Sequence, residues 1–193
     1  MKTIFKLSAA AALLAATAAP ALADALTIDL SRVLTDSAAG KSGTAQLKAK
    51  YDAQLQQRNQ AFNTAAQTYQ TQVNAARAAA KPGVQPAQAT LTAIQQAGER
   101  AQAAQDSLNQ LGQEVQSVEG YVRQQIIEHV GPIAEQIRTE RKADIVVPKG
   151  SVLASDPAGD VTTLVIQRLD TAFPNPSIVL PNQPAAPAAG PGR

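Results

Sequence analysis

The chain is divided by six residues, Lys81-Pro82-Gly83-Val84-Gln85-Pro86, into two very long segments that are rich in alanine and glutamine. A Pro-Gly pair ends a helix, whereas a proline is well placed in the first turn of the next one. Apolar or small residues recur every three or four positions on both sides, which is typical of amphipathic helices. The short connection requires the two helices to run antiparallel. The sequence therefore predicts a long helical hairpin with its tip at residues 81–86.

Each arm of the predicted hairpin carries one narrow apolar stripe. In the first arm, from about residue 44 to residue 80, the stripe consists of Leu47, Tyr51, Leu55, Phe62, Ala66, Tyr69, Val73, Ala76 and Ala80. In the second arm, from about residue 87, it consists of Leu91, Ile94, Ala97, Ala101, Ala104, Leu108, Leu111, Val115, Val118, Val122, Ile126, Val130, Ile133 and Ile137. At about 1.5 Å per residue, arms of roughly 40 and 55 residues would reach some 60 and 80 Å. The pair Gly131-Pro132 predicts a kink or a break near the end of the second arm.

Short strand-like stretches flank the hairpin. The first alternates in polarity, with Leu26, Ile28 and Leu30 on one face, which is typical of a half-buried strand. Ser31 can then cap a brief turn. Residues 143–148 predict a second strand because they are rich in β-branched side chains and end at a proline.

The region after the second strand completes the predicted fold. Residues 151–154 are a candidate third strand, and Asp160 can cap a final helix. The sequence thus predicts a mainly α fold with a small β body, from which the long antiparallel helical hairpin projects. We assign residues 24–43 and 143–173 to the body and residues 44–142 to the hairpin.

The two ends of the chain carry different signals. Residues 1–23 have a positive start, an apolar stretch and Ala21-Leu22-Ala23 at a cleavage position, which together predict a signal peptide that is removed on export. The mature chain would then have 170 residues. The last 20 residues, 174–193, contain six prolines with several alanines and glycines, and we expect an extended, disordered tail there.

Composition excludes several classes of function. Cleavage would remove two lysines and leave 15 basic against 15 acidic residues, without the cluster of positive charge that nucleic-acid binding needs. The chain has no cysteine, so disulfides cannot stabilise it after export. Aromatic side chains supply much of the buried area of ordinary cores, and they make up 3% of this sequence. The composition therefore favours a thin, elongated or oligomeric protein that binds no nucleic acid.

Catalysis has little support in the sequence. The single histidine, His129, follows Glu128, but on a helix these neighbours point in different directions. A metal site needs several converging ligands, and acid–base catalysis needs a cleft. We find no nucleophilic cysteine, phosphate-binding loop or paired carboxylates, and we expect no enzyme activity, metal or cofactor.

Three pieces of the sequence together resemble the Skp or OmpH-like family of periplasmic chaperones. The first is residues 28–34 followed by Ser37-Ala38-Ala39-Gly40-Lys41, and the second is the pair of unequal helices around one tip. The third is the ending, with Ala143-Asp144-Ile145-Val146-Val147, then 152–154, then Asp160-Val161-Thr162 and residues 165–169. The resemblance covers roughly residues 26–170.

This resemblance implies both an assembly and an activity. Proteins of this family are homotrimers in which short strands form a central body and three hairpins enclose a cavity. They keep unfolded outer-membrane polypeptides soluble in the periplasm without ATP. Hairpins of this family are often strongly basic, whereas residues 44–123 here carry seven Lys/Arg and five Asp/Glu. We therefore carry over no lipopolysaccharide-binding residues, and contact with lipopolysaccharide or a membrane surface stays open.

Two groups of residues are candidates for functional contacts. The proposed oligomerisation core consists of Ile28, Leu30, Ile145, Val146 and Val147, although these residues could instead form a two-stranded core within one chain. The proposed seam or client-contact residues are Phe62, Tyr69, Val73, Leu91 and Ile94, and packing of the two helices on each other is the simpler interpretation. A holdase that binds unfolded outer-membrane β-barrel polypeptides is favoured over the alternative, a coiled-coil adaptor that spaces or tethers envelope components.

Overall fold

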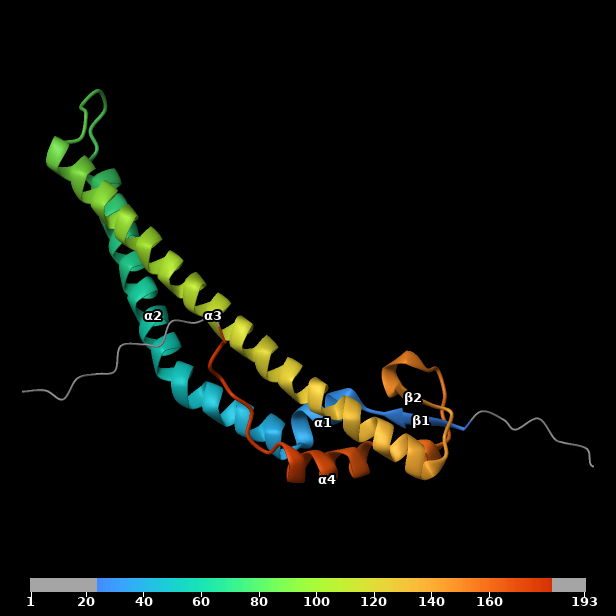
Figure 1. Cartoon of the computed structure of the whole chain (residues 1–193). Helices are drawn as coiled ribbons and strands as arrows, with labels where there is room; N and C mark the ends of the chain where they lie inside the picture. The colour runs from blue at the N-terminus through green and yellow to red at the C-terminus, as the bar shows by residue number, and fades with distance from the viewer. Residues whose placement is uncertain (1–23, 182–193) are drawn as a thin grey trace, which may run out of the picture.

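The computed structural model describes residues 24–181 of the 193-residue chain. Two long helices pair as a hairpin, and a small body closes its open end (Figure 1). The elements are, in order, β1 (Ala25–Ile28), α1 (Leu30–Asp36), α2 (Ala38–Ala79), α3 (Gln88–Arg141), β2 (Ile145–Pro148), the 3₁₀ turns η1 (Lys149–Ser151) and η2 (Pro157–Gly159), and α4 (Thr162–Ala172). The predicted fold class is confirmed. The predicted signal peptide, residues 1–23, lies outside the described residues.

The hairpin turns where the sequence predicts it. Helix α2 ends at Ala79 and α3 begins at Gln88, two residues after Pro86. Between them Gly83 has a φ angle of +77°, a conformation that glycine adopts without the steric cost of a Cβ atom. The start of the first arm differs from the prediction, because α2 begins at Ala38 rather than near Thr44.

The expected break at Gly131-Pro132 is absent from the structure. Helix α3 runs without interruption from Gln88 to Arg141 and contains Pro132 in its interior. Proline removes one backbone hydrogen bond and crowds the preceding turn, but the side chain of Pro132 is exposed and the flanking Val130 and Ile133 are buried. We infer that burial of these neighbours holds the helix together across the proline.

The β body is a two-stranded parallel sheet. Strand β1 pairs with β2 in the register Ala25↔Ile145 to Ile28↔Pro148. Parallel strands need a long crossover connection, and here the entire hairpin is that connection. Residue Thr27 also bridges to Asp160, and the Val161 amide donates to the Thr27 carbonyl over 3.0 Å. Strand β1 is therefore covered on both edges, whereas no described strand covers the outer edge of β2.

Several local predictions for the body need correction. The side chains of Leu26, Thr27 and Ile28 are all buried, so β1 is enclosed on both faces rather than half-buried. Leu30 is not in the strand but opens α1, whose N-cap is Asp29 instead of Ser31. The candidate third strand at residues 151–154 is not formed, since η1 ends at residue 151 and irregular chain follows.

The hydrophobic core is concentrated at the base of the hairpin. Buried residues from β1, α1, α3 and α4 form one cluster there, with Ile126, Ile137, Val165 and Leu169 among the most enclosed. A second, smaller cluster lies farther along the arms around Tyr51, Leu111 and Val118. Toward the tip, within residues 52–110, only Ala97 is buried, so burial of apolar surface stabilises the hairpin mainly at its base.

Candidate functional site

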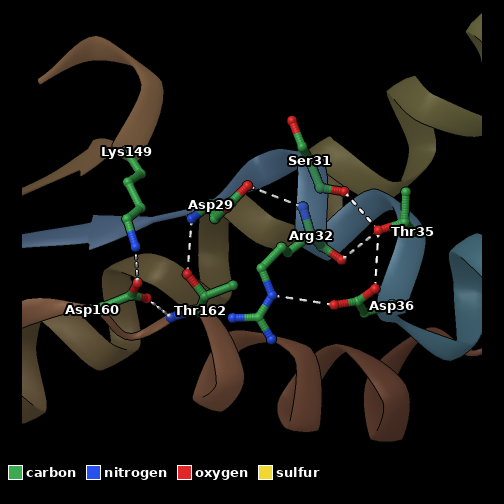
Figure 2. A network of polar contacts seen from close by, with 8 residues as sticks. All are labelled: Asp29, Ser31, Arg32, Thr35, Asp36, Lys149, Asp160 and Thr162. Carbon is green, nitrogen blue, oxygen red and sulfur yellow. Dashed lines mark hydrogen bonds and ion pairs between the residues drawn. The ribbon is translucent and has the colours of Figure 1, made fainter. Parts of the chain in front are cut away.

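A polar network joins elements of the body to one another, namely the end of β1, α1, η1 and the start of α4 (Figure 2). The Asp29 amide donates to Thr162 Oγ1 over 2.8 Å, which ties the end of β1 to the start of α4. The carboxylate of Asp29 in turn accepts from the Arg32 amide over 3.0 Å and caps α1. Arg32 pairs with Asp36 across one helical turn at 3.2 Å. These contacts hold β1, α1 and α4 together.

Asp160 is the most perturbed acid of this network. Its carboxylate accepts from Lys149 Nζ over 2.7 Å and from the Thr162 amide over 3.0 Å. The hydrogen bond from Lys149, followed by those from Thr162, lowers the pKa of Asp160 to about 2. The bond to the Thr162 amide also satisfies the first turn of α4, as the sequence predicts for this residue, although the formal N-cap is Val161. A carboxylate held ionised by such partners has a structural role and is unsuited to proton transfer near neutral pH.

The single histidine, His129, also makes contacts that stabilise the fold. The ring of His129 stacks on Phe173 with 3.8 Å between ring centroids and 8° between planes. Its Nδ1 lies 2.8 Å from the Gln125 carbonyl oxygen, and since a carbonyl only accepts, Nδ1 must carry a proton. Among residues 24–181, no group of His, Asp and Glu side chains is arranged to hold a metal ion. His129 thus anchors the end of α4 on α3.

The two arms of the hairpin leave an open groove near the base. Helix α2 bows away from α3 beyond their close approach at Gly43 (Figure 1), where an added Cβ would lie 2.7 Å from Val122 Cγ1. The groove has a volume of about 410 Å³ and is lined by α1, α2 and α3. We call it the seam groove, and its large apolar lining residues are Leu34, Leu47, Tyr51, Leu55, Val115, Val122 and Ile126. A second hollow of about 450 Å³ lies farther toward the tip, beside Ala61, Ala65 and Ala97.

The opposite face of the same seam is covered by the chain itself. Residues 174–181 leave α4 and run between α2 and α3, as the red coil in Figure 1 shows. Pro176 is buried, and Ile178 and Leu180 pack on the cluster of Tyr51, Leu111 and Val118. The expectation of a disordered tail from residue 174 therefore does not hold for residues 174–181, and residues 182–193 lie outside the described residues.

The residues predicted for an oligomerisation core are only partly buried within one chain. Ile28 is buried in the core and Leu30 is half-buried in α1. On β2, Val146 and Val147 are half-buried, whereas Ile145 is 48% exposed. The neighbouring Leu153 is fully exposed. Ile145 on β2 and Leu153 thus leave apolar side chains of the body exposed in one chain.

The residues predicted for the seam or for client contact are spread along the outer half of the hairpin. Phe62, Val73 and Ile94 are half-buried between the arms. Tyr69 packs near Gly98 but remains 39% exposed, and Leu91 is 45% exposed. The structure does not bring these five residues into one cluster.

Sequence reasoning did not predict that residues 174–181 pack on the hairpin, nor which residues bind them. Gln46 and Gln125 contact the segment, but glutamines in a glutamine-rich helix give no distinguishing signal. The run Ser177-Ile178-Val179-Leu180 is apolar and β-branched inside a Pro/Ala-rich tail, and this contrast could have indicated an ordered segment.

Comparison with known proteins identifies a family and a solved structure to which the chain is similar. The sequence pattern of the family described as outer membrane protein (OmpH-like) matches residues 25–169. In structure the chain is similar to a "putative outer membrane chaperone (OmpH-like)" from Caulobacter crescentus CB15, with a TM-score of 0.52 and 20% sequence identity. That match covers 82% of this chain and 90% of the other. No curated protein matches the sequence. Of the helices within residues 24–181, none is both long and apolar enough to cross a membrane.

Proposed function

This chain belongs to the OmpH-like outer membrane protein family, and we propose that it is an ATP-independent periplasmic holdase for unfolded outer-membrane proteins. The predicted signal peptide supports export to the periplasm. The description of the Caulobacter structure as an outer membrane chaperone supports the same role. This activity requires a surface that binds many unfolded sequences weakly and releases them without ATP hydrolysis.

The observation that carries this proposal is the incompletely closed seam of the hairpin. The seam groove leaves apolar surface of α1, α2 and α3 open to solvent, and Tyr69, Val84 and Leu91 add exposed apolar side chains farther along the arms. Apolar contact has no required geometry, so such surface accepts different sequences. Several contacts along one long arm add up through effective concentration although each one alone is weak.

We further propose that the holdase is a homotrimer. An isolated two-stranded sheet is marginal in water, and the outer edge of β2 is uncovered in one chain. Ile145, which lies on β2, and Leu153, which follows shortly after it in sequence, also expose apolar side chains. Packing of these surfaces between copies around an axis would place the three hairpins side by side, so that their arms could surround one client.

The proposal is tested by measuring the molar mass of the mature protein by light scattering, alone and after dilution of a urea-unfolded outer-membrane barrel into it. We expect a trimer that keeps the barrel soluble in a discrete complex of defined mass. The control is the same barrel diluted into buffer, where it should aggregate.

Other outcomes would point elsewhere. A trimer that leaves the barrel to aggregate would contradict the holdase and favour an envelope adaptor that binds a folded partner. A stable, folded monomer at submicromolar concentration would contradict the trimer.

A further inference from the structure

The segment of residues 174–180 is bound to the hairpin as a peptide ligand would be. Gln46 Nε2 donates to the Pro176 carbonyl over 3.1 Å, and Ser42 Oγ contacts Asn175 Oδ1 over 2.9 Å. Pro176 itself is buried, with its Cγ close to Gly43. The contacts come from α2 and α3 together, so the segment bridges the two arms.

The central contact recognises the backbone and not the side chain. Gln125 Nε2 donates to the Ser177 carbonyl over 2.8 Å, and the Ser177 amide donates to Gln125 Oε1 over 3.0 Å. One side-chain amide thus satisfies both backbone polar groups of one residue, its N–H and its C=O. Every residue except proline offers that pair of groups in an extended chain, so this contact does not depend on sequence.

The apolar contacts follow a period of two. Ile178 and Leu180 pack on the cluster around Tyr51 and Leu111, whereas Val179 between them is 62% exposed. Alternation of inward and outward side chains is the pattern of an extended strand. Transmembrane strands of outer-membrane barrels alternate apolar and polar residues in the same way, so their unfolded segments carry the pattern that this face accepts.

We propose that this face of the hairpin is a binding site for extended polypeptide segments with alternating apolar residues, and that the chain's own residues 174–180 occupy it until a client segment displaces them. The inference rests on the proposed holdase function for the identity of the client. The occupying segment follows α4 directly, so its effective concentration at the site is high, on the order of millimolar for a short connection. A competing client must therefore offer several segments at once, which an unfolded barrel does and a short peptide does not.

The first test frees the site in the full-length mature chain. The double variant Ile178→Asp and Leu180→Asp removes both inward side chains of the segment and leaves α2 and α3 unchanged. The matched control is Val179→Asp, which adds charge at the outward position. The probe is a fluorescent synthetic peptide with the sequence of residues 174–181, and its binding is followed by anisotropy.

We expect the double variant to bind the labelled peptide at least about tenfold more tightly than the Val179→Asp control, because the internal competitor is gone. Urea-unfolded barrel should displace the bound peptide. Equal binding to the two variants would overturn the inference. Bound peptide that the barrel does not displace, although light scattering shows a barrel complex, would overturn it as well.

A second measurement avoids any effect of the aspartates on folding. The chain has no cysteine, so Val179→Cys gives one attachment point for a nitroxide label at an outward position. Addition of unfolded barrel should raise the mobility of the label in its electron paramagnetic resonance spectrum, while a folded soluble protein of similar mass should not. If the mobility of the label stays unchanged although light scattering shows a barrel complex, the client does not displace residues 174–180. That result would overturn the inference and leave the holdase function intact. Peptide binding by the double variant in a protein that fails to keep barrels soluble would support the site and contradict the holdase.

Discussion

Thr27 places a hydroxyl in the core without a partner. Thr27 is 1% exposed in β1, and its Oγ1 makes no hydrogen bond to any residue within 24–181. Burial of an unpaired hydroxyl costs about 1–3 kcal/mol as judged from protein variants.

Replacement of Thr27 by Val should therefore raise the free energy of unfolding by about 1–2 kcal/mol, because valine has the same shape without the hydroxyl. Urea unfolding at one fixed protein concentration measures the change, since the stability of an oligomer depends on concentration. Thr27→Ser is the control, because it keeps the hydroxyl and loses the methyl group, and it should be less stable than wild type. A Val variant no more stable than wild type would indicate that the hydroxyl has a partner in solution.

Asp160 makes stability depend on pH in the acid range. Its pKa is about 2 in the folded chain against 3.8 as the ordinary value, first because of the hydrogen bond from Lys149. A carboxylate with a depressed pKa stabilises the fold at pH values above its unfolded pKa. That contribution falls as the pH drops from about 4 through the folded pKa near 2.

We expect Asp160→Asn to lower the free energy of unfolding by roughly 1–2 kcal/mol at pH 6, after allowance for solvent screening of the pair, and by less at pH 3. Asparagine can still accept from the Thr162 amide, so the variant isolates the charge. Lys149→Met should remove most of the same pH dependence in the wild-type background. A difference between wild type and Asp160→Asn that is constant from pH 6 to pH 3 would contradict this account.

At the scale of elements, glycine allows α1 and α2 to approach closely. A Cβ built on Gly40 would lie 1.9 Å from the Leu34 carbonyl oxygen and 2.7 Å from its carbon. Those atoms are backbone, so α1 itself would have to move. The start of α2 is fixed at the same point by Ser37 Oγ, which accepts from the Gly40 amide, and by the Asp170 carboxylate, which accepts from the Ala38 amide over 2.6 Å.

Gly40→Ala should thus destabilise the fold by about 3 kcal/mol, at the upper end of the range for overpacking. Gly112→Ala is the matched control, because its Cβ would meet no atom within 4 Å in the interior of α3, and alanine is the better helix former. This control should gain about 0.5–1 kcal/mol. The melting temperatures of both variants, measured by thermal unfolding, test these expectations. Equal melting temperatures would show that α1 shifts to accommodate the added methyl group without loss of stability.

The elements of the hairpin could be predicted from sequence because their signals are local. The three- and four-residue spacing of apolar positions and the Pro82-Gly83 pair specify two helices and a tip. The effect of Pro132 could not be predicted in this way, because whether a proline breaks a helix depends on how firmly its neighbours are buried. The parallel pairing of β1 with β2 and the seating of residues 174–181 depend on contacts between residues far apart in sequence, for which a single sequence carries little local signal.

At the scale of the whole molecule, the body of a single chain exposes large apolar side chains to solvent. Leu153 is fully exposed and Ile145 is 48% exposed, both close in sequence to the open edge of β2. The buried core at the hairpin base is complete within one chain, since Ile126, Val165 and Leu169 enclose each other there. Loss of assembly should therefore separate the copies without melting α3 and α4.

Replacement of Leu153 by Asp should lower the molar mass from that of the proposed trimer to that of a monomer at micromolar concentration, because a charge buried at an interface without a partner costs several kcal/mol per copy. The helical circular dichroism signal should persist at low temperature. Val84→Asp at the hairpin tip is the control, since Val84 is also exposed but lies far from the body, and this variant should keep the wild-type mass. Light scattering of the wild type, Leu153→Asp and Val84→Asp measures these molar masses. An unchanged mass for Leu153→Asp would place the contact between copies on another surface, and the arms could then project from the assembly in a different arrangement.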